Sequence, residues 1–323
     1  MESSALIYAY VLDGPNKGQA LDLQQVQHLD VPEHTTWLHF DYSHPDTRNW
    51  LRECEWVDNL VAKSLISEET RPRASQIEQG LVVALRGVNL NPESCPEDMV
   101  SIRLWVTDKL IISARKRRLL STSDMAEQIA SGKGPETTGQ FLAMLAERLI
   151  SRMQSVVYDI EDKVSEIEEL TQTQDPQSLR HQIADLRRQS IALRRYLRPQ
   201  NEAMNVLQNN EAGLFSDDDL SHLRETMNHL VRYLEELESI KDRAAVTQEE
   251  LAGAVNEQLN SRMYVLSIVA ALFLPLGFLT GLLGINVGGI PGAENPDSFW
   301  IFCAFLSVLI GAQVVIFKWR RWF

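Results

Sequence analysis

Charged and apolar residues are distributed unevenly along this chain, and the unevenness is greatest near its carboxyl end. Met263–Leu283 is a run of 21 residues without a charge, and Phe299–Phe317 is a second run of 19. As helices they would measure roughly 31 and 28 Å, close to the hydrocarbon thickness of a bilayer. A buried core helix is the alternative, but core helices seldom continue so far without a charge. The pattern predicts a two-helix transmembrane hairpin.

The first 122 residues show a different pattern, in which short β-branched or aromatic runs alternate with turn residues. Asp41–Cys54 is typical of a helix that follows a strand, with Ser43 or Asp46 as its cap. The fold class predicted for this part is an α+β domain, a mixed sheet with helices. The expected strands are Ala5–Leu12, Thr36–Tyr42, Gly80–Leu85, Met99–Thr107 and Lys109–Ala114.

From about Ser123 the apolar residues recur at steps of three and four, which predicts long amphipathic helices. Asp175-Pro176 should end the first helix, and the second should end near Pro199. Ser216 can cap a third helix, and no proline separates that helix from the first apolar run, so one continuous helix to Gly284 is expected. The apolar stripes are Leu142, Leu145, Leu149, Met153, Val156, Ile160, Val164, Ile167 and Leu170; then Leu179, Ile183, Leu186, Leu193 and Leu197; then Leu223, Met227, Leu230, Leu234, Leu237, Ile240 and Ala244.

These patterns divide the chain into three parts. We expect a cytosolic α/β domain over residues 1–122 and a cytosolic helical region over 123–262, which includes the start of a long stalk helix. The transmembrane hairpin with a basic tail occupies 263–323. Two helices cannot enclose an aqueous path alone, so a chain of this kind that moves a solute must assemble as several copies around one axis.

Basic residues indicate how the hairpin is oriented. Arg262 precedes the first span, whereas the loop Gly284–Ser298 has acidic residues and no Lys or Arg. Lys and Arg are enriched on the cytoplasmic side of membranes, so both termini should be cytoplasmic and the loop outside. We expect a multi-pass protein of the inner (plasma) membrane. The basic residues after the second span are Lys318, Arg320 and Arg321.

The formal net charge is −13, and over half of it lies in the stalk. Residues 216–260 contain eleven acidic and four basic residues, a net charge of −7. A solvated helix face is the plain interpretation of such a run. The functional alternative is an acidic vestibule that raises the local concentration of cations, with a field multiplied by the assembly of several copies.

Candidate chemistry lies where the first span should meet the outer water, at Gly284-Ile285-Asn286. A neutral amide offers its oxygen to a hydrated cation without holding it tightly. That suits an ion that releases water reluctantly, because conduction requires binding weak enough to allow departure. Taken alone, however, these three residues favour a plain Gly-Asn turn.

The surrounding residues carry a resemblance. Phe273–Asn286, which reads FLPLGFLTGLLGIN, is similar to the signature of the CorA superfamily of divalent-cation transporters, and Arg194–Pro199 also resembles that family's cytosolic part. The resemblance implies a funnel-shaped homopentamer whose pore is lined by the first span. Ile285 replaces the methionine of the family's Gly-Met-Asn, and Val287–Gly292 resembles the zinc-transporting, ZntB-like branch.

The same resemblance implies roles for single residues. Asn286 matches the selectivity asparagine, which would hold the metal through its hydrating water, and Gly284 matches its glycine neighbour. Gly277 and Gly281 are open to a second interpretation, as a packing contact between helices. Pro275 removes the hydrogen bond to the carbonyl of residue 271 and could act as a hinge. The pore-lining positions are Met263, Leu266, Ala270, Leu274, Gly277 and Gly281, and their spacing alone puts them on one helix face.

Other candidates are weaker. His34, His39 and His44 could form a regulatory metal site, but ordinary histidines are the simpler interpretation. The basic run Arg115–Arg118 in an acidic chain indicates a solvated turn, not nucleic-acid binding. No catalytic or cofactor motif is present, so we expect no enzyme and no cofactor.

The predicted function is transport of divalent metal cations, zinc foremost, with lipid and identical copies as partners. A magnesium, cobalt or nickel channel is the alternative within that class, and a membrane-anchored coiled-coil scaffold or sensor is the alternative outside it.

Overall fold

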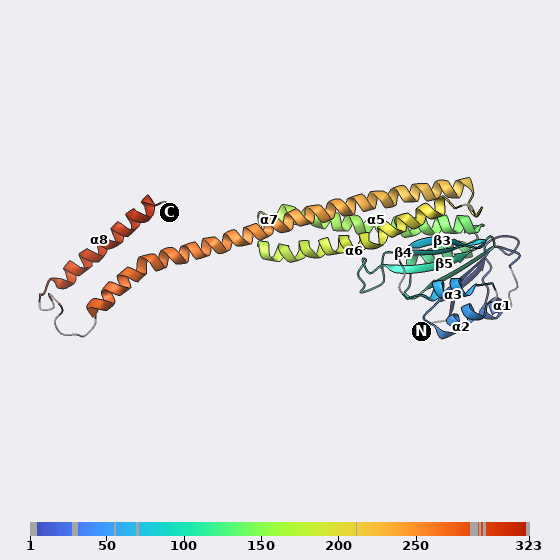
Figure 1. Ribbon diagram of the computed structural model, residues 1–323, viewed down its shortest axis with the longest axis horizontal. Coiled ribbons are helices and arrows are strands. Elements are labelled where there is room, and N and C mark those ends of the chain that lie inside the picture. Colours follow the sequence, from blue (N-terminus) through green and yellow to red (C-terminus); the bar gives the residue numbers. More distant parts are fainter. Residues whose placement is uncertain are drawn as a thin grey trace. The chain divides into compact units, whose positions relative to one another are not determined.

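A computed structural model describes residues 5–27, 32–54, 56–68, 71–210, 212–284, 290, 292 and 295–320. By its contacts the chain forms two compact units, residues 1–249 and 250–323 (Figure 1). The boundary between the units falls inside the longest helix. The divisions predicted at residues 122 and 262 stay predictions.

The first unit contains a six-stranded mixed sheet with the order β1-β2-β6-β5-β4-β3. β2 and β6 run parallel, and every other neighbouring pair is antiparallel. All of β2 is buried, which is expected of a strand covered on both faces. The strands are β1 (Leu6–Val11), β2 (Thr36–Asp41), β3 (Arg73–Ile77), β4 (Gly80–Gly87), β5 (Val100–Val106) and β6 (Leu110–Arg115).

Five of these strands lie where the sequence predicts them, and the predicted mixed sheet with helices is confirmed. β3 is the strand that the sequence analysis missed. Its five residues, Arg73–Ile77, include no fully buried one, because β3 is an edge strand paired only with β4. Without a buried face there is no alternation of apolar and polar residues to detect.

One face of the sheet packs against short helices (Figure 1). Leu38, Phe40 and Ile112 from the strands contact Leu51 and Leu65 from the helices in one buried cluster. The helices of this layer are α1 (Leu23–Gln27), α2 (Pro45–Glu53) and α3 (Asn59–Ile66).

The predicted cap of α2 is wrong. Neither Ser43 nor Asp46 caps the helix; His44 does, because its Nδ1 accepts a hydrogen bond from the backbone N–H of Asp46 at 3.3 Å. Ser43 instead donates to the Asp41 carboxylate, and Pro45 supplies the fixed φ that suits the first helical position.

The opposite face of the sheet is covered by α4 (Leu120–Ala130), α5 (Thr138–Leu170) and α6 (Pro176–Gln208). The centre of the Trp37 ring on β2 lies 5.0 Å from the centre of the Phe141 ring on α5. Gly87 of β4 lies close to α5: a Cβ there would stand 2.8 Å from a methyl carbon of Leu149, which would have to shift. The predicted stripes of α5 and α6 are the buried ones, apart from the half-buried Leu170.

The second helix does not end at Pro199 as predicted. α6 continues to Gln208 with Pro199 inside it. Proline removes one helical hydrogen bond, a loss that tertiary packing can offset. Here Leu197 and Met204 are buried on either side of the proline, and the buried Gln200 side chain accepts a hydrogen bond from the Arg86 backbone N–H at 2.7 Å.

The third helix is confirmed as continuous: α7 spans Asp217–Gly284, 68 residues. Its start is a reciprocal capping box, in which the Asp219 N–H donates to the Ser216 hydroxyl while the Ser216 N–H donates to the Asp219 carboxylate. Within the first unit, α7 lies along α5 and α6 (Figure 1). α8 spans Ser298–Trp319.

Candidate functional site

The second unit contains the end of α7 and all of α8, and most of their described side chains are exposed. Both helices have a segment long and apolar enough to cross a membrane, yet almost none of the residues in these two segments is buried within the chain. Phe273 is 67% exposed and Val308 is 72% exposed. Water would penalise such a surface by ~25 cal/mol per Å², so these helices need lipid or further protein around them.

The six predicted pore-lining residues lie on one face of α7. Their steps of three and four residues bring position 281 back into line with position 263 after five turns. Met263, Leu266 and Leu274 are 66, 69 and 74% exposed. A Cβ added at Gly277 or Gly281 would have no described atom within 4 Å. Among the described residues of one chain, no side chain covers this face.

Two hydroxyl groups of the first span are satisfied within the helix itself. The Ser267 hydroxyl donates to the Met263 carbonyl at 2.8 Å, and the Thr280 hydroxyl donates to the Leu276 carbonyl at 2.9 Å. Such bonds to the preceding turn tend to bend a helix. Pro275 lies between them inside α7, as predicted. The bend-prone features of the first span therefore all fall within residues 267–280.

The predicted selectivity tripeptide is described only in part. Gly284 is the last residue of α7, whereas Ile285 and Asn286 lie outside the described residues. On the other side of the loop, the Ser298 hydroxyl donates to the Gly292 carbonyl at 2.6 Å, and the Asn295 side chain accepts from the Asp297 N–H at 3.0 Å. These bonds lie at the start of α8.

Charged residues of α7, one of them acidic, join it to the neighbouring helices of the first unit. Glu238 forms an ion pair with Arg194 of α6. Arg243 donates to Glu168 of α5, with its Nε 3.1 Å from Oε1, and this bond raises the pKa of the Arg243 guanidinium. Burial raises the pKa of the Glu236 carboxyl. Part of the acidic run is therefore structural, while Asp217, Asp218, Glu225, Glu235, Asp242, Glu249, Glu250 and Glu257 are exposed.

The three candidate histidines have separate roles. His34 Nδ1 lies 3.1 Å from an Asp13 carboxylate oxygen, and His44 caps α2. His39 is fully buried, with its Nδ1 2.7 Å from the Ser113 hydroxyl, and burial lowers its pKa to about 3. No group of three or more His, Cys, Asp or Glu side chains in the described part of the chain is placed to hold a metal ion.

A mixed-sheet domain leads into the long helix α7, which ends in one membrane-length apolar segment, and α8 supplies the second. This arrangement defines a two-span membrane protein. The family model described as "CorA-like Mg2+ transporter protein" matches residues 32–320. The chain belongs to the CorA family, and it is a divalent-cation transporter, not an enzyme.

Individual relatives match over the whole chain. The divalent cation transporter CmaX of Pseudomonas aeruginosa is 40% identical over 324 residues, which cover 99% of this chain and 98% of that protein. The zinc transport protein ZntB of Yersinia enterocolitica is 35% identical over 323 residues, which cover 100% and 97%. The solved structure of full-length CmaX has a TM-score of 0.83 at 39% identity, and the match covers 100% of this chain and 99% of that one.

Proposed function

We propose that this protein carries zinc across the inner membrane as a homopentamer, with the first span of each copy around a central pore. The observation that carries the proposal is the unpartnered face of α7, whose six apolar or small residues end at the Gly284-Ile285-Asn286 tripeptide. A face that one chain leaves open is what a ring of copies would enclose. The relatives support the ion: two of the matched proteins are named for zinc or divalent-cation transport.

The chemistry of the first span favours a hydrated ion. Zinc bound directly by protein takes His, Cys or carboxylate ligands, and residues 263–284 contain none of these. A ring of Asn286 amides at the outer mouth would accept hydrogen bonds from the ion's water shell and release the ion again. Selection would then depend on size and charge.

The orientation follows from the basic residues. Arg262 before the first span and Lys318 after the second support a cytoplasmic position for both termini. The exposed acids of α7 would then face the cytosolic solution as an acidic vestibule, where they raise the local concentration of cations. Pro275, with the Ser267 and Thr280 bonds beside it, is the proposed hinge of the pore helix.

Uptake into liposomes that contain only this protein tests the proposal. A zinc-sensitive dye inside the vesicles should report flux for the wild type, and Asn286→Ala should lower the zinc rate or its preference over magnesium by about tenfold, the effect of losing an ion contact worth ~1.4 kcal/mol. Asn256→Ala, an exposed amide lower in α7, is the matched control and should leave the rate unchanged.

The same assay separates the alternatives. If magnesium, cobalt or nickel passes and zinc does not, the protein is a channel for those other ions. If the vesicles stay impermeant to every divalent ion, the membrane-anchored scaffold is the remaining alternative. A protein that is monomeric in lipid would rule out a pore formed by several copies.

A further inference from the structure

The three long helices of the first unit differ in charge. α5 contains seven carboxylates and three basic residues, and residues 217–249 of α7 contain nine carboxylates and four basic residues. α6 contains six arginines and only two carboxylates, and its residues 186–201 contain five arginines and no carboxylate. α6 is therefore a basic helix beside two acidic ones.

Part of this positive charge lies on the outer face of α6, opposite its buried stripe. Arg188, Ile191 and Arg195 share that face, because steps of three and four residues return to the same side of a helix. The side chain of Arg188 is 73% exposed, Ile191 is 47% exposed, and Arg195 is also exposed. The outer face of α6 thus presents a branched apolar side chain between two arginines.

The outer face of α7 presents the opposite charge. Asp242, Val246 and Glu249 lie on it at steps of four and three residues. The side chain of Asp242 is 65% exposed, Val246 is 58% exposed, and Glu249 is also exposed. Read in opposite directions along the two helices, the spacings of the two faces are the same, so antiparallel helices can match them position by position. The matched pairs are Arg188 with Glu249, Ile191 with Val246, and Arg195 with Asp242.

Contacts within one chain neutralise these faces only weakly. Arg188 pairs with Asp185, and Asp242 pairs with Lys241, but the carboxylate of each pair is exposed to solvent, which weakens the attraction. The residues of the two faces that belong to no ion pair within the described part of the chain are Arg195 and Glu249. Both faces therefore keep charge that a partner of opposite sign can pair with.

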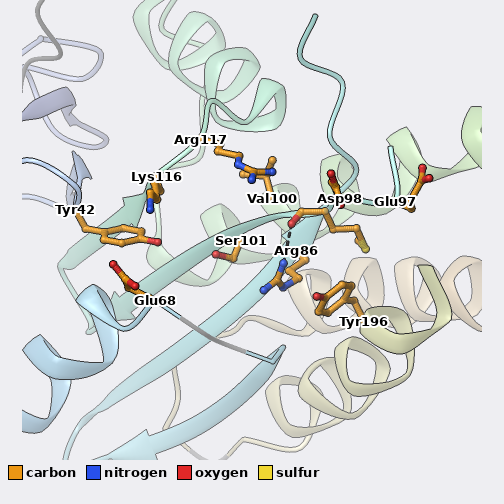
Figure 2. A pocket seen from close by; sticks show the side chains of 11 residues that line it. Tyr42, Glu68, Arg86, Glu97, Asp98, Val100, Ser101, Lys116, Arg117 and Tyr196 are labelled. Carbon is orange, nitrogen blue, oxygen red and sulfur yellow. Dashed lines mark hydrogen bonds between the residues drawn. The ribbon is translucent and has the colours of Figure 1, made fainter. Parts of the chain in front are cut away.

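Contacts with the sheet fix the orientation of α6. Tyr196, the residue after Arg195, turns toward Arg86 of β4, at the edge of a cavity of about 310 Å³ that Arg117 also lines (Figure 2). The Arg86 Cζ lies 4.1 Å from the centre of the Tyr196 ring, and the Arg86 backbone N–H donates to the Gln200 side chain at 2.7 Å. Rotation of α6 about its axis would break both contacts, so Arg195 is held on the outer side.

Rotational symmetry determines which residues of two neighbouring copies meet. If the axis of the proposed ring runs along these helices, each residue keeps its height in every copy, so the residues that meet are those that lie level within one chain. Arg187 donates to Gln248 at 3.1 Å, and Arg198 lies 3.5 Å from Glu238. These contacts put residue 188 level with about residue 247 and residue 195 level with about residue 241, one or two residues from their matched partners. Two residues are about 3 Å along a helix, which an arginine side chain can span.

We propose that the outer face of α6 in one copy binds the outer face of α7 in the next copy. The arginines at 188 and 195 would pair with the carboxylates at 249 and 242, on either side of the contact between Ile191 and Val246. The inference rests on the assembly of copies proposed above, and it states where their first units touch. Because the two faces differ, the contact is heterologous and repeats from copy to copy until a ring closes. Contact of α7 with α7, or of α6 with α6, would instead oppose like charges, which costs binding energy.

The same register limits the contact. Toward the carboxyl end of α6 it would place Glu202 opposite Glu235 of α7, and these two exposed carboxylates repel each other. The attractive contact should therefore end between Arg195 and Glu202. The exposed acids of the first unit's part of α7 that stay outside the contact, and so remain available to the proposed acidic vestibule, are Asp217, Asp218, Glu225 and Glu235.

Disulfide cross-linking of the full-length protein in detergent tests the proposal, in a chain whose three cysteines are replaced by serine. Copies that carry both Ile191→Cys and Val246→Cys should form covalent oligomers under mild oxidation, because a disulfide requires two Cβ atoms within about 4.5 Å. Denaturing electrophoresis resolves the products. Ile191→Cys with Val231→Cys is the matched control, since Val231 lies on the same side of α7, is 39% exposed, and is about 22 Å from position 246 by the helical rise. The control pair should give less than about a tenth of the cross-linked product.

Reversal of charge tests whether the ion pairs drive the contact. Asp242→Arg with Glu249→Arg should lower the rate of cross-linking by at least about tenfold at low salt, because like charges then face each other. Adding Arg188→Glu and Arg195→Glu restores the attraction and should return the rate to within about threefold of the original. A folding defect cannot produce such a recovery.

Arg52→Glu with Lys63→Glu controls for net charge, since these exposed cations lie on α2 and α3, and it should change the rate by less than about twofold. Three results would overturn the proposal: only monomers after oxidation, as much product from the control pair with Val231→Cys, or no recovery when the charges are swapped. The experiment measures no transport, so its failure would leave the zinc proposal standing. Vesicles impermeant to zinc, together with an efficient cross-link, would contradict the zinc proposal and support this contact.

Discussion

Leucine side chains have opposite surroundings in the two compact units of this chain. Leu145 and Leu149 of α5, in the first unit, are 0 and 1% exposed, whereas Leu266 and Leu274 of α7, in the second, are 69 and 74% exposed. The first unit buries its apolar residues within one polypeptide, so its stability follows from contacts that a single chain makes. The second unit leaves most of its described apolar side chains exposed, so that surface needs lipid or further protein around it.

This difference separates two kinds of experiment. A substitution in the first unit should change the free energy of unfolding and leave the permeation path intact. A substitution on the proposed pore-lining face of α7 should change transport and leave the stability of the first unit unchanged. Each variant below tests whether the two units respond independently.

The largest effect is expected on the proposed pore face. Gly281→Phe would place a ring where no described atom lies within 4 Å in the single chain but where a narrow pore is proposed. Zinc uptake into liposomes should fall by at least about tenfold, because a hydrated ion cannot pass a constriction of aromatic side chains. Leu279→Phe, on the opposite side of the same helix, is the control. Equal loss of flux in both variants would argue against the assigned face.

The next effect is expected in the core. Leu145→Ala removes a fully buried side chain and should lower the free energy of unfolding of the first unit by about 2–5 kcal/mol. Leu60→Ala is the matched control, since Leu60 is 58% exposed. Chemical denaturation followed by circular dichroism measures both. A Leu145 variant as stable as the Leu60 variant would contradict the packing of α5 on the sheet.

A pH effect of moderate size should come from His39. Burial lowers its pKa to about 3 in the folded protein, whereas the unfolded chain takes up a proton near pH ~6.5. The folded state therefore loses relative stability as the pH falls below ~6.5, by about 2 kcal/mol at pH ~5. His39→Asn keeps a polar atom near Ser113 but does not titrate. Its stability should vary less with pH over this range; an unchanged slope would assign the effect to other groups.

The smallest effect is expected at the ion pair between Glu168 of α5 and Arg243 of α7. The side chains of Arg243 and Glu168 are 34 and 32% exposed, so solvent weakens their ion pair. A double-mutant cycle with Arg243→Met and Glu168→Gln should give a coupling below about 1 kcal/mol, reduced further by salt. A coupling of several kcal/mol that salt does not change would show that this pair is buried in the assembled protein.

The sequence predicts those strands and helices in which apolar residues recur at a regular spacing. The five strands with a buried face and the long helices were found because burial imposes a spacing of two or of three and four. The edge strand β3 was missed because nothing buries its residues. Pro199 predicts a helix end because proline removes one helical hydrogen bond, but burial of Leu197 and Met204 outweighs that loss.

The candidate site was predictable to a different degree. Residues spaced three and four positions apart lie on one face of any α-helix, so the sequence was sufficient to predict that the six residues of the first span share a face. The cavity lined by Arg86 and Arg117 was not predictable, because these residues lie 31 positions apart and only the sheet brings them to one place. No local motif marks such a convergence of distant residues, which becomes visible only when the strand register is known.

The parallel pairing of β2 with β6 has a consequence for how the protein is made. His39 and Ser113 are hydrogen-bonded neighbours across that pairing although 74 residues separate them. Closing so long a loop is slow compared with forming a hairpin, so the middle of the sheet should be completed late in folding. Yet the ribosome synthesises both strands before either apolar segment. The first unit can therefore complete its folding before the apolar segments insert into the bilayer.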